Sequence, residues 1–381
     1  MVEGFTLLAS SAQSSARAGI LKTAHGEIQT PVFMPVGTQG SVKALTPRDL
    51  VAADARIILG NTYHLYLRPG CDLVAEAGGL HRFISWDRAL LTDSGGFQVW
   101  SLDELRKIRP EGVEFRSHID GSKHLFTPQA VMNHQRRLGA DIIMAFDECT
   151  PYPASEAQVS QSLQLTQRWT ESALEWLDKN PPLHGYPQQF FGIVQGGMYV
   201  ESRLAAIEHL LPFDLPGYAI GGLSVGEPAD IMYTVAEACT RVLPAHKPRY
   251  VMGVGTPENL LELIKRGVDM FDCVLPTRNA RNGTVYTWEG PLHFKAARHA
   301  KEFDKPLDSH CSCYACKNFS RAYIRHLFHA GEISALHLAS LHSLHFFLSL
   351  MKTAREKILI GEFEAWSGDL MRRWQASKAS A

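Results

Sequence analysis

The sequence lacks an excess of charge of either sign. Its 381 residues contain 38 Lys and Arg against 39 Asp and Glu, which gives a formal net charge of −1. A protein without a strong overall field does not attract nucleic acid over its whole surface, so any such contact must depend on local groups of basic residues. The length allows one large domain together with a smaller one.

Targeting and disulfide patterns are also missing. The N-terminus carries Glu3 and only a short apolar run over residues 5–9, so no secretory signal is expected. The most apolar stretch, residues 335–351, contains three histidines and is short for a membrane span, which favours a buried helix. The cysteines are odd in number, seven, and four are scattered along the chain, which favours a reducing cytoplasm over a disulfide framework.

Eight short apolar runs follow residue 30, and each ends at a glycine or a polar residue. They are residues 31–36, 56–59, 89–91, 141–146, 190–194, 218–220, 250–254 and 270–275. Such runs indicate strands covered on both faces, and the helix-forming segments between them indicate parallel crossovers. Eight units over about 250 residues predict an α/β fold, a TIM (β/α)8 barrel. An open doubly wound sheet is the alternative, but no G-x-G-x-x-G follows the first strand.

The predicted organisation has three parts. A hairpin over residues 1–30 caps the barrel, the barrel covers residues 31–298, and a metal-binding subdomain with C-terminal helices covers residues 299–381. Long connections follow the third and eighth strands, where Asp120-Gly121 and Asn282-Gly283 indicate turns. Both connections leave the C-terminal ends of strands, the end that carries the chemistry of barrels.

Three of the seven cysteines lie within six residues, as Cys311, Cys313 and Cys316. Thiolates in this C-x-C-x2-C spacing can fold around one tetrahedral ion, and a closed shell of sulfur and imidazole ligands is typical of structural zinc. The fourth ligand could come from any of three later histidines, His337, His342 or His345. We therefore predict a structural Zn²⁺ in the subdomain, with three unrelated thiols as the alternative.

Three carboxylates stand at or just past strand ends: Asp93, Asp147 and Asp272. The strand ends of a barrel converge on one cleft, so acids far apart in sequence can meet there. Paired carboxylates suit displacement at an anomeric carbon, because one can attack or stabilise the cationic centre while the other moves a proton. Helix N-caps and ion-paired structural aspartates are the ordinary alternatives.

Two further groups of residues indicate a ligand. Gln195 and the backbone of residues 221–223 end neighbouring strands and could read the edge of a flat heterocycle, with Phe97 and Met252 as stacking surfaces; turn and core residues are the alternative. Basic residues follow the eighth strand, first Arg278 and Arg281 and then Lys295, Arg298, Lys301 and Lys305. They predict a phosphate-contacting stripe beside the cleft, or for the lysines a solvated helix face.

Taken together, these stretches resemble the bacterial form of the tRNA-guanine transglycosylases, the queuine/pre-queuosine tRNA-ribosyltransferase family. The matching stretches cover nearly the whole chain in order: residues 30–37 (TPVFMPVG), 59–65 (LGNTYHL), 92–98 (TDSGGFQ), 144–149 (MAFDEC), 194–197 (VQGG), 221–227 (GGLSVGE), 272–278 (DCVLPTR) and the cysteine cluster. The fold that the resemblance implies is a TIM barrel with an inserted zinc subdomain.

The resemblance also implies residue roles. Asp272 would be the nucleophile that attacks the ribose of the wobble guanosine, and Asp93 would be the general acid/base, with a covalent ribosyl-aspartate intermediate. The base would be held by Asp147, Gln195, Gly222, Leu223, Phe97, Met252, Cys149 and Ser94. Arg278 and Arg281 would grip the anticodon loop of the tRNA, and His342 would be the fourth zinc ligand.

Substrates and partners follow from the same resemblance. Val225 stands where eukaryotic members have a glycine, and its bulk favours 7-aminomethyl-7-deazaguanine over queuine. The expected reaction exchanges guanine 34 of GUN-anticodon tRNAs (Asp, Asn, His, Tyr) for this base, a step in queuosine biosynthesis. A cytoplasmic homodimer without a membrane is expected. Ser343 departs from the family's usual asparagine after the last zinc ligand, and Phe97 stands in place of a frequent tyrosine.

Two other functions fit part of the pattern. A retaining glycoside hydrolase could use Asp93 and Asp272, and it would release free sugar without needing RNA. A zinc-containing tRNA-binding subunit without activity is the second possibility, but such a protein should lack the two acids, and both are present.

Overall fold

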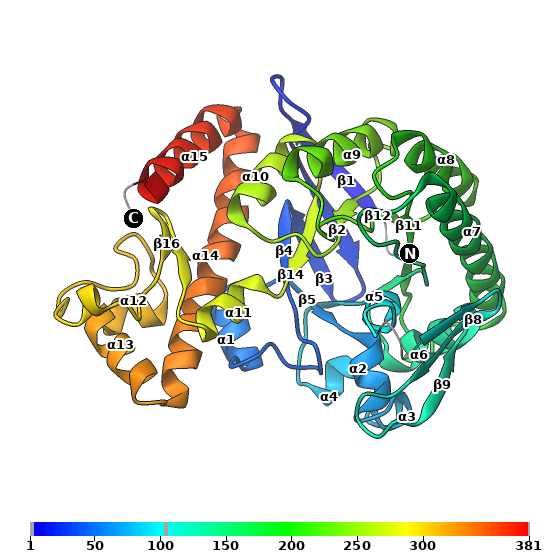
Figure 1. Cartoon of the computed structure of the whole chain (residues 1–381), viewed down its shortest axis with the longest axis horizontal. Helices are drawn as coiled ribbons and strands as arrows, with labels where there is room; N and C mark the ends of the chain where they lie inside the picture. The colour runs from blue at the N-terminus through cyan, green and yellow to red at the C-terminus, as the bar shows by residue number, and fades with distance from the viewer. Residues whose placement is uncertain (1–3, 103–105, 380–381) are drawn as a thin grey trace.

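The computed structural model describes residues 4–102 and 106–379, and its larger part is a barrel of eight parallel strands (Figure 1). The strands are β4 (Val32–Pro35), β5 (Ile57–Gly60), β6 (Ala89–Thr92), β10 (Ile142–Met144), β11 (Gln189–Val194), β12 (Gly217–Ile220), β13 (Arg249–Val251) and β14 (Met270–Cys273). Their order in the sheet is β4-β14-β13-β12-β11-β10-β6-β5. A parallel bridge between Val36 and Leu59 joins the two ends, so the predicted TIM barrel is confirmed.

Helices surround the ring of strands in Figure 1. They are α1 (Pro47–Ala52), α2 (Thr62–Leu67), α3 (Cys71–Glu76), α4 (Leu80–Phe83), α6 (Pro128–Leu138), α7 (Glu156–Lys179), α8 (Val200–Leu210), α9 (Ala229–Val242) and α10 (Pro257–Lys265). Three of them begin with a threonine whose side chain accepts a backbone N–H, followed directly by proline: Thr46, Thr127 and Thr256. Such caps satisfy N–H groups that a helix start leaves free, so each helix begins at a defined residue.

The N-terminal segment is a three-stranded antiparallel sheet, where the sequence predicted one hairpin. Its strands are β1 (Phe5–Ser10), β2 (Arg17–Thr23) and β3 (Gly26–Thr30). Phe5 is the one buried residue of strand β1, so the sequence carries no alternating apolar pattern from which this strand could be predicted. The β2–β3 turn docks where strand β10 begins, because His25 Nδ1 lies 2.8 Å from Oδ1 of the buried Asp141. The sheet thus lies at the N-terminal end of the barrel strands.

Both predicted insertions form antiparallel sheets at the opposite end. The first contains β8 (Gly112–Arg116) and β9 (Lys123–Phe126), as Asp120-Gly121 predicted, together with β7 (Arg106–Arg109) as a third strand. The second is the hairpin of β15 (Val285–Thr287) and β16 (Gly290–Leu292). Two short helices, α5 (Gly96–Trp100) and α11 (Leu275–Arg281), also follow strand ends.

The smaller lobe, on the left in Figure 1, contains α12 (Tyr314–Asn318), α13 (Arg321–His329), α14 (Ile333–Leu359) and α15 (Phe363–Ala379). Its own apolar cluster includes Val285 and Phe294, whereas the second half of α14 belongs to the barrel core through Phe347, which packs on Phe33. The predicted division at residues 298/299 therefore does not coincide with the packing, because α14 belongs to both cores.

Helix α14 is, within the described ranges, the one helix long and apolar enough by composition to cross a membrane. However, 61% of its most apolar window is buried inside the protein, between the barrel and the smaller lobe. The predicted buried helix over residues 335–351 is thus observed, and its apolar character is explained by contacts on several sides.

Candidate active site

A cavity of about 340 Å³ opens at the C-terminal ends of the barrel strands. Its lining includes all ten residues that the sequence predicted for catalysis and base binding: Asp93, Ser94, Phe97, Asp147, Cys149, Gln195, Gly222, Leu223, Met252 and Asp272. These residues come from the ends of β6, β10, β11, β12, β13 and β14. The fold therefore brings together groups that are up to 179 positions apart in sequence (272 − 93).

Asp93 follows strand β6 and is held from three sides. Asn61 Nδ2 donates to its Oδ2 at 2.5 Å, and the backbone N–H groups of Thr62 and Gly95 donate to its Oδ1 at 2.8 and 3.2 Å. Burial raises the pKa of Asp93 to about 6, although the bonds from Asn61 and Thr62 act in the opposite direction. The negative charge of Asp272 contributes to the rise of this pKa, so the two carboxylates interact electrostatically.

Asp272 lies within strand β14 and is anchored through one oxygen. Tyr250 donates its phenol proton to Oδ1 at 2.5 Å, and the Gly253 backbone N–H donates to the same atom at 2.8 Å. Among the described residues none donates a hydrogen bond to Oδ2, which is therefore available to a ligand. Burial raises the pKa of Asp272, while these two hydrogen bonds stabilise its charged form.

Asp147 and Gln195 form a polar pair on the opposite wall. Gln195 Nε2 donates to Asp147 Oδ2 at 2.6 Å, and Gln195 Oε1 is buried without a hydrogen-bond partner in the structure. A side chain at Gly96 would begin 2.9 Å from the Asp147 backbone oxygen, and one at Gly222 would begin 2.5 Å from Gln195 Oε1. Glycine at both positions keeps the slot beside this pair open.

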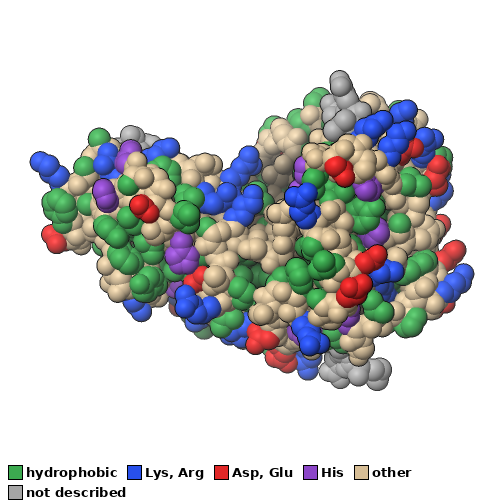
Figure 2. Space-filling model, turned by 90° about the horizontal axis from the view of Figure 1, so that it is seen from below, with side chains coloured by type: hydrophobic (Ala, Val, Ile, Leu, Met, Phe, Trp, Pro, Cys, Tyr) green, Lys and Arg blue, Asp and Glu red, His purple; other side chains and the backbone are tan. Residues whose placement is uncertain are grey.

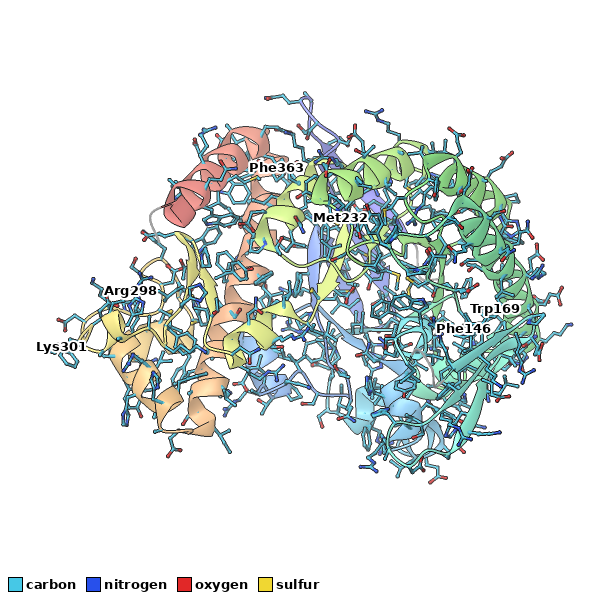
Figure 3. The ribbon with its side chains drawn as sticks, in the orientation of Figure 1. Phe146, Trp169, Met232, Arg298, Lys301 and Phe363 are labelled. Carbon is cyan, nitrogen blue, oxygen red and sulfur yellow. The ribbon has the colours of Figure 1, made fainter. Side chains whose placement is uncertain are left out.

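Asp147 is positioned by packing beneath it. The preceding Phe146 is fully buried and stacks on Trp169 of α7, with ring centroids 4.7 Å apart and planes 16° apart (Figure 3). Burial raises the pKa of Asp147 to about 6, against the hydrogen bond from Gln195. A slot with a protonatable acid and an amide oxygen that no described residue pairs is suited to a polar, flat ligand.

The remaining walls are less polar. Phe97 is 51% exposed and stacks on Trp100 at 5.4 Å, while Met252 is half-buried on another strand end. Burial raises the pKa of the Cys149 thiol to about 12, so this wall is neutral. Ser94 accepts the Gly96 N–H at 3.3 Å.

A second groove of about 390 Å³ adjoins the cavity and is basic. It is lined by Lys43, Arg278 and Arg281, and it shares Val36, Thr38 and Val274 with the cavity. In the described part of the chain, no carboxylate forms an ion pair with these two arginines, which favours an anionic ligand. Figure 2 shows Lys and Arg side chains gathered where the smaller lobe meets the barrel.

The other predicted basic residues do not extend this groove. Arg298 and Lys301 lie at the outer tip of the smaller lobe, away from the barrel (Figure 3). Lys305 pairs with Glu302 at 3.0 Å, and Lys295 lies over the ring of Phe328 at 5.6 Å. Of the predicted stripe, Arg278 and Arg281 line the groove beside the cavity, whereas Arg298 and Lys301 belong to another surface.

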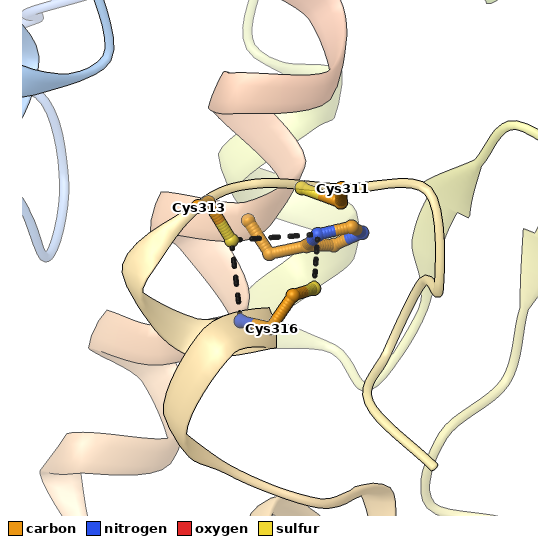
Figure 4. Close-up of side chains that lie close together, drawn as sticks. Cys311, Cys313 and Cys316 are labelled. Carbon is orange, nitrogen blue, oxygen red and sulfur yellow. Dashed lines mark hydrogen bonds between the residues drawn. The ribbon is translucent and has the colours of Figure 1, made fainter.

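The predicted metal ligands converge in the smaller lobe, and none of them lines the cavity. Ligand atoms of Cys311, Cys313, Cys316 and His342 all lie within 4.8 Å of one another. Figure 4 shows the cysteine side chains around one imidazole, whose Nδ1 is 3.3 Å from Cys316 Sγ and 3.8 Å from Cys313 Sγ.

The donor set fits a zinc ion. His342 Nε2 lies 3.1 Å from the carbonyl oxygen of Tyr286, which can only accept, so Nε2 carries the proton and the Nδ1 lone pair faces the sulfurs. His337 instead contacts the Ala44 carbonyl, and His345 lies outside the four-ligand group although its Nδ1 is 3.4 Å from Cys311 Sγ. Ser343 is fully buried, and among the described residues its hydroxyl has no hydrogen-bond partner.

Sequence reasoning missed two residues of the site, Asn61 and Tyr250. Asn61 is a polar residue directly after strand β5, the same signal that identified Asp93, and so it could have been found. Tyr250 lies inside strand β13 and reads as an ordinary core residue. Residues 222–226 also match the G-x-S-x-G spacing of hydrolases, but no histidine is hydrogen-bonded to Ser224 in the described ranges, so this serine lacks a base.

Comparison with known proteins gives one consistent result. The family model described as queuine tRNA-ribosyltransferase matches residues 11–376. A queuine tRNA-ribosyltransferase of Thermoanaerobacter sp. (strain X514) is 57% identical over 93% of both chains. The proteins of that name from Caldanaerobacter subterraneus subsp. tengcongensis and Ruminiclostridium cellulolyticum are 55% and 52% identical, each over 98% of this chain and 98% and 99% of their own.

Proposed function

The chain belongs to the queuine tRNA-ribosyltransferase family, and on this premise we propose that it is a tRNA-guanine transglycosylase, a pentosyltransferase of queuosine biosynthesis. Its substrates are tRNAs with GUN anticodons (Asp, Asn, His, Tyr), whose guanine 34 it exchanges for 7-aminomethyl-7-deazaguanine. The observation that carries the proposal is that Asp93 and Asp272 share one cavity with the slot beside Asp147 and Gln195.

In the first half of the reaction Asp272 is the nucleophile. Its Oδ2 attacks C1′ of ribose 34, the C1′–N9 bond breaks, and the electron pair stays on guanine, which takes a proton from Asp93. This step needs Asp272 ionised and Asp93 protonated. The hydrogen bonds to Oδ1 of Asp272 favour the anion, and the raised pKa of Asp93 keeps its proton accessible near neutral pH.

The second half reverses these roles. Asp93, now ionised, removes the N9 proton of the incoming base, N9 attacks C1′, and the C1′–O bond breaks with its electron pair returned to the Asp272 carboxylate. Each half inverts the configuration at C1′, so the product retains it. The two acids therefore act in turn at one carbon, which requires them to face the same cavity.

The slot suits the edge of a guanine-like base. Asp147 can accept hydrogen bonds from the base N1–H and amino group, while Gln195 and the Gly222 N–H can donate to its O6. Leu223, Ser94, Phe97 and Met252 line the same cavity, and Cys149 provides a neutral wall. Phe97 and Met252 would stack on the two faces of the base. Val225 also lines the cavity, where its bulk favours the small aminomethyl substituent.

The partner is RNA at the basic groove. Arg278 and Arg281 line this groove, where they would grip the anticodon loop through its phosphates. The enzyme acts in the cytoplasm, where its tRNA substrate is made, and as a homodimer in which the second subunit helps to orient the tRNA. Cys311, Cys313, Cys316 and His342 would hold a Zn²⁺ ion, which would crosslink the smaller lobe and supply no chemistry to the exchange.

The test is incorporation of labelled guanine into tRNA with a GUN anticodon. We expect incorporation at position 34, and a covalent protein–RNA adduct on a denaturing gel that Asp272→Asn abolishes. The matched control is Asp369→Asn, the same change on an exposed aspartate of α15, which should leave both signals intact. A retaining glycoside hydrolase would instead release free sugar, and lack of guanine incorporation by the unaltered protein would overturn the proposal.

A further inference from the structure

Arg203 is a fully buried arginine behind the base slot, on α8. Its guanidinium donates to four backbone carbonyls: Gly197 at 2.9 Å, Val194 at 2.6 Å, Gly221 at 2.7 Å and Gly222 at 3.5 Å. Within the described residues it makes no ion pair with a carboxylate, and Glu227 acts on it only through its charge. Burial lowers the pKa of Arg203, so the protein bears a cost to keep this cation there.

One of the four carbonyls belongs to Val194, the last residue of strand β11, and the other three belong to the loops that follow β11 and β12. Val194 and Gly221 directly precede two residues of the slot, Gln195 and Gly222. The Gly221 N–H also donates to the Val194 oxygen at 3.1 Å, so Arg203 and this bond tie the two strand ends together. Arg203 therefore fixes the distance between the Gln195 amide and the Gly222 backbone.

The hydrogen bond to the Gly221 carbonyl also fixes the direction in which the next N–H group, that of Gly222, points. In a trans peptide the C=O and N–H groups point to opposite sides. Because the Gly221 carbonyl points at Arg203, the Gly222 N–H of the same peptide unit points away from it, toward the cavity that Gly222 lines. In the described part of the chain this N–H donates to no protein atom, so it is free to meet an acceptor on the ligand.

From this geometry we propose that Arg203 is a positioning residue for base recognition. It aims the Gly222 N–H at the base O6 and holds it at a fixed spacing from Gln195, without touching the substrate. The inference depends on the proposed function, because the ligand of the slot is taken to be a guanine-like base. A merely structural arginine would support the fold without altering the affinity for the base.

The experiment compares two buried arginines, Arg203 and Arg355, that both donate hydrogen bonds to backbone carbonyls. Arg355 is also buried and donates to the carbonyls of Gly19 and Thr30 at 2.6 Å, and none of these three residues lines the cavity. For each site we would prepare the Lys and Met variants and measure Tm, kcat, the KM for free guanine and the Kd of guanine by calorimetry. Activity is expressed per folded molecule, so that partial unfolding does not count as a change in KM.

We expect Arg203→Lys to raise the KM and the Kd for guanine about tenfold, the effect of one misaligned hydrogen bond, with a small change in kcat. Arg203→Met should be worse than Arg203→Lys, and the Arg355 variants should lower Tm but leave KM unchanged. Unchanged guanine affinity in a folded Arg203→Lys protein would overturn the role of Arg203. Failure of the unaltered protein to exchange or bind guanine would overturn the proposed function and this role together.

Discussion

The phenol of Tyr250 donates a 2.5 Å hydrogen bond to Oδ1 of Asp272, inside the cavity that also contains Asp93. This bond stabilises the carboxylate that the proposed reaction uses as nucleophile. Together with the Gly253 N–H it leaves Oδ2 as the oxygen free to attack. Tyr250 is thus a neutral hydrogen-bond donor. A cation at the same place would bind the Asp272 carboxylate more tightly and make it a weaker nucleophile.

Replacing Tyr250 by phenylalanine tests this arrangement. A hydrogen bond to a charged group contributes about 1.5–3 kcal/mol, and its loss in Tyr250→Phe should raise the pKa of Asp272. Because a smaller fraction of the nucleophile is then ionised, adduct formation should slow by about 10- to 100-fold, measured in a single turnover. Tyr218→Phe is the control, because Tyr218 is buried in the neighbouring strand β12 and lies outside the cavity lining. Equal rates for Tyr250→Phe and the unaltered protein would contradict the role of the phenol.

The pH dependence of kcat/KM for tRNA should report Asp93. Its pKa is raised to about 6, and the first half-reaction needs its protonated form, so kcat/KM should fall as pH rises through about 6. Asn61→Ala removes a donor that favours the charged form, which raises the pKa of Asp93 and moves the fall to higher pH.

The control for this profile is Asn180→Ala, since the Asn180 side chain donates to the Trp176 carbonyl at the end of α7 and does not line the cavity. Its profile should match that of the unaltered protein. If the falling limb is absent, or if Asn61→Ala moves it to lower pH, Asp93 is not the acid of the first step.

Removal of the metal should act on stability before activity. Cys313→Ser takes one ligand from the buried site, so we expect less than one zinc per chain by atomic absorption and a Tm lowered by at least about 5 °C. Cys71→Ser, at a buried cysteine of α3, should retain the metal. Full zinc retention in Cys313→Ser would contradict the assigned ligand set.

The basic groove predicts a salt-dependent effect on RNA binding. Arg281→Gln should weaken tRNA binding and reduce the slope of log K against log salt by about 0.7–0.9, the contribution of one phosphate contact. Arg298→Gln removes the same charge at the outer tip of the smaller lobe and should change neither quantity. Equal effects of the two substitutions would mean that net charge, not the groove, governs binding.

The order of the elements was determined by the sequence alone. Eight continuous apolar runs with polar ends are a local property, and they identified every barrel strand within a few residues. The cysteine spacing identified three residues of the cluster that could hold a metal ion, because C-x-C-x2-C brings them together within one loop. Acids directly after strands were visible for the same reason, since the C-terminal ends of barrel strands share one face.

Only the tertiary structure determined those features of the site that depend on contacts between distant segments of the chain. Of the three candidate histidines, the fold places His342 in the cysteine cluster, and its Nε2 meets the Tyr286 carbonyl, 56 positions away. Asp272 is anchored by Tyr250 of another strand. Arg203 had no signal, because a buried arginine that pairs with backbone carbonyls looks like any surface cation in a helix. Side-chain patterns reveal which face is buried, but hydrogen-bond partners are chosen only when the barrel closes.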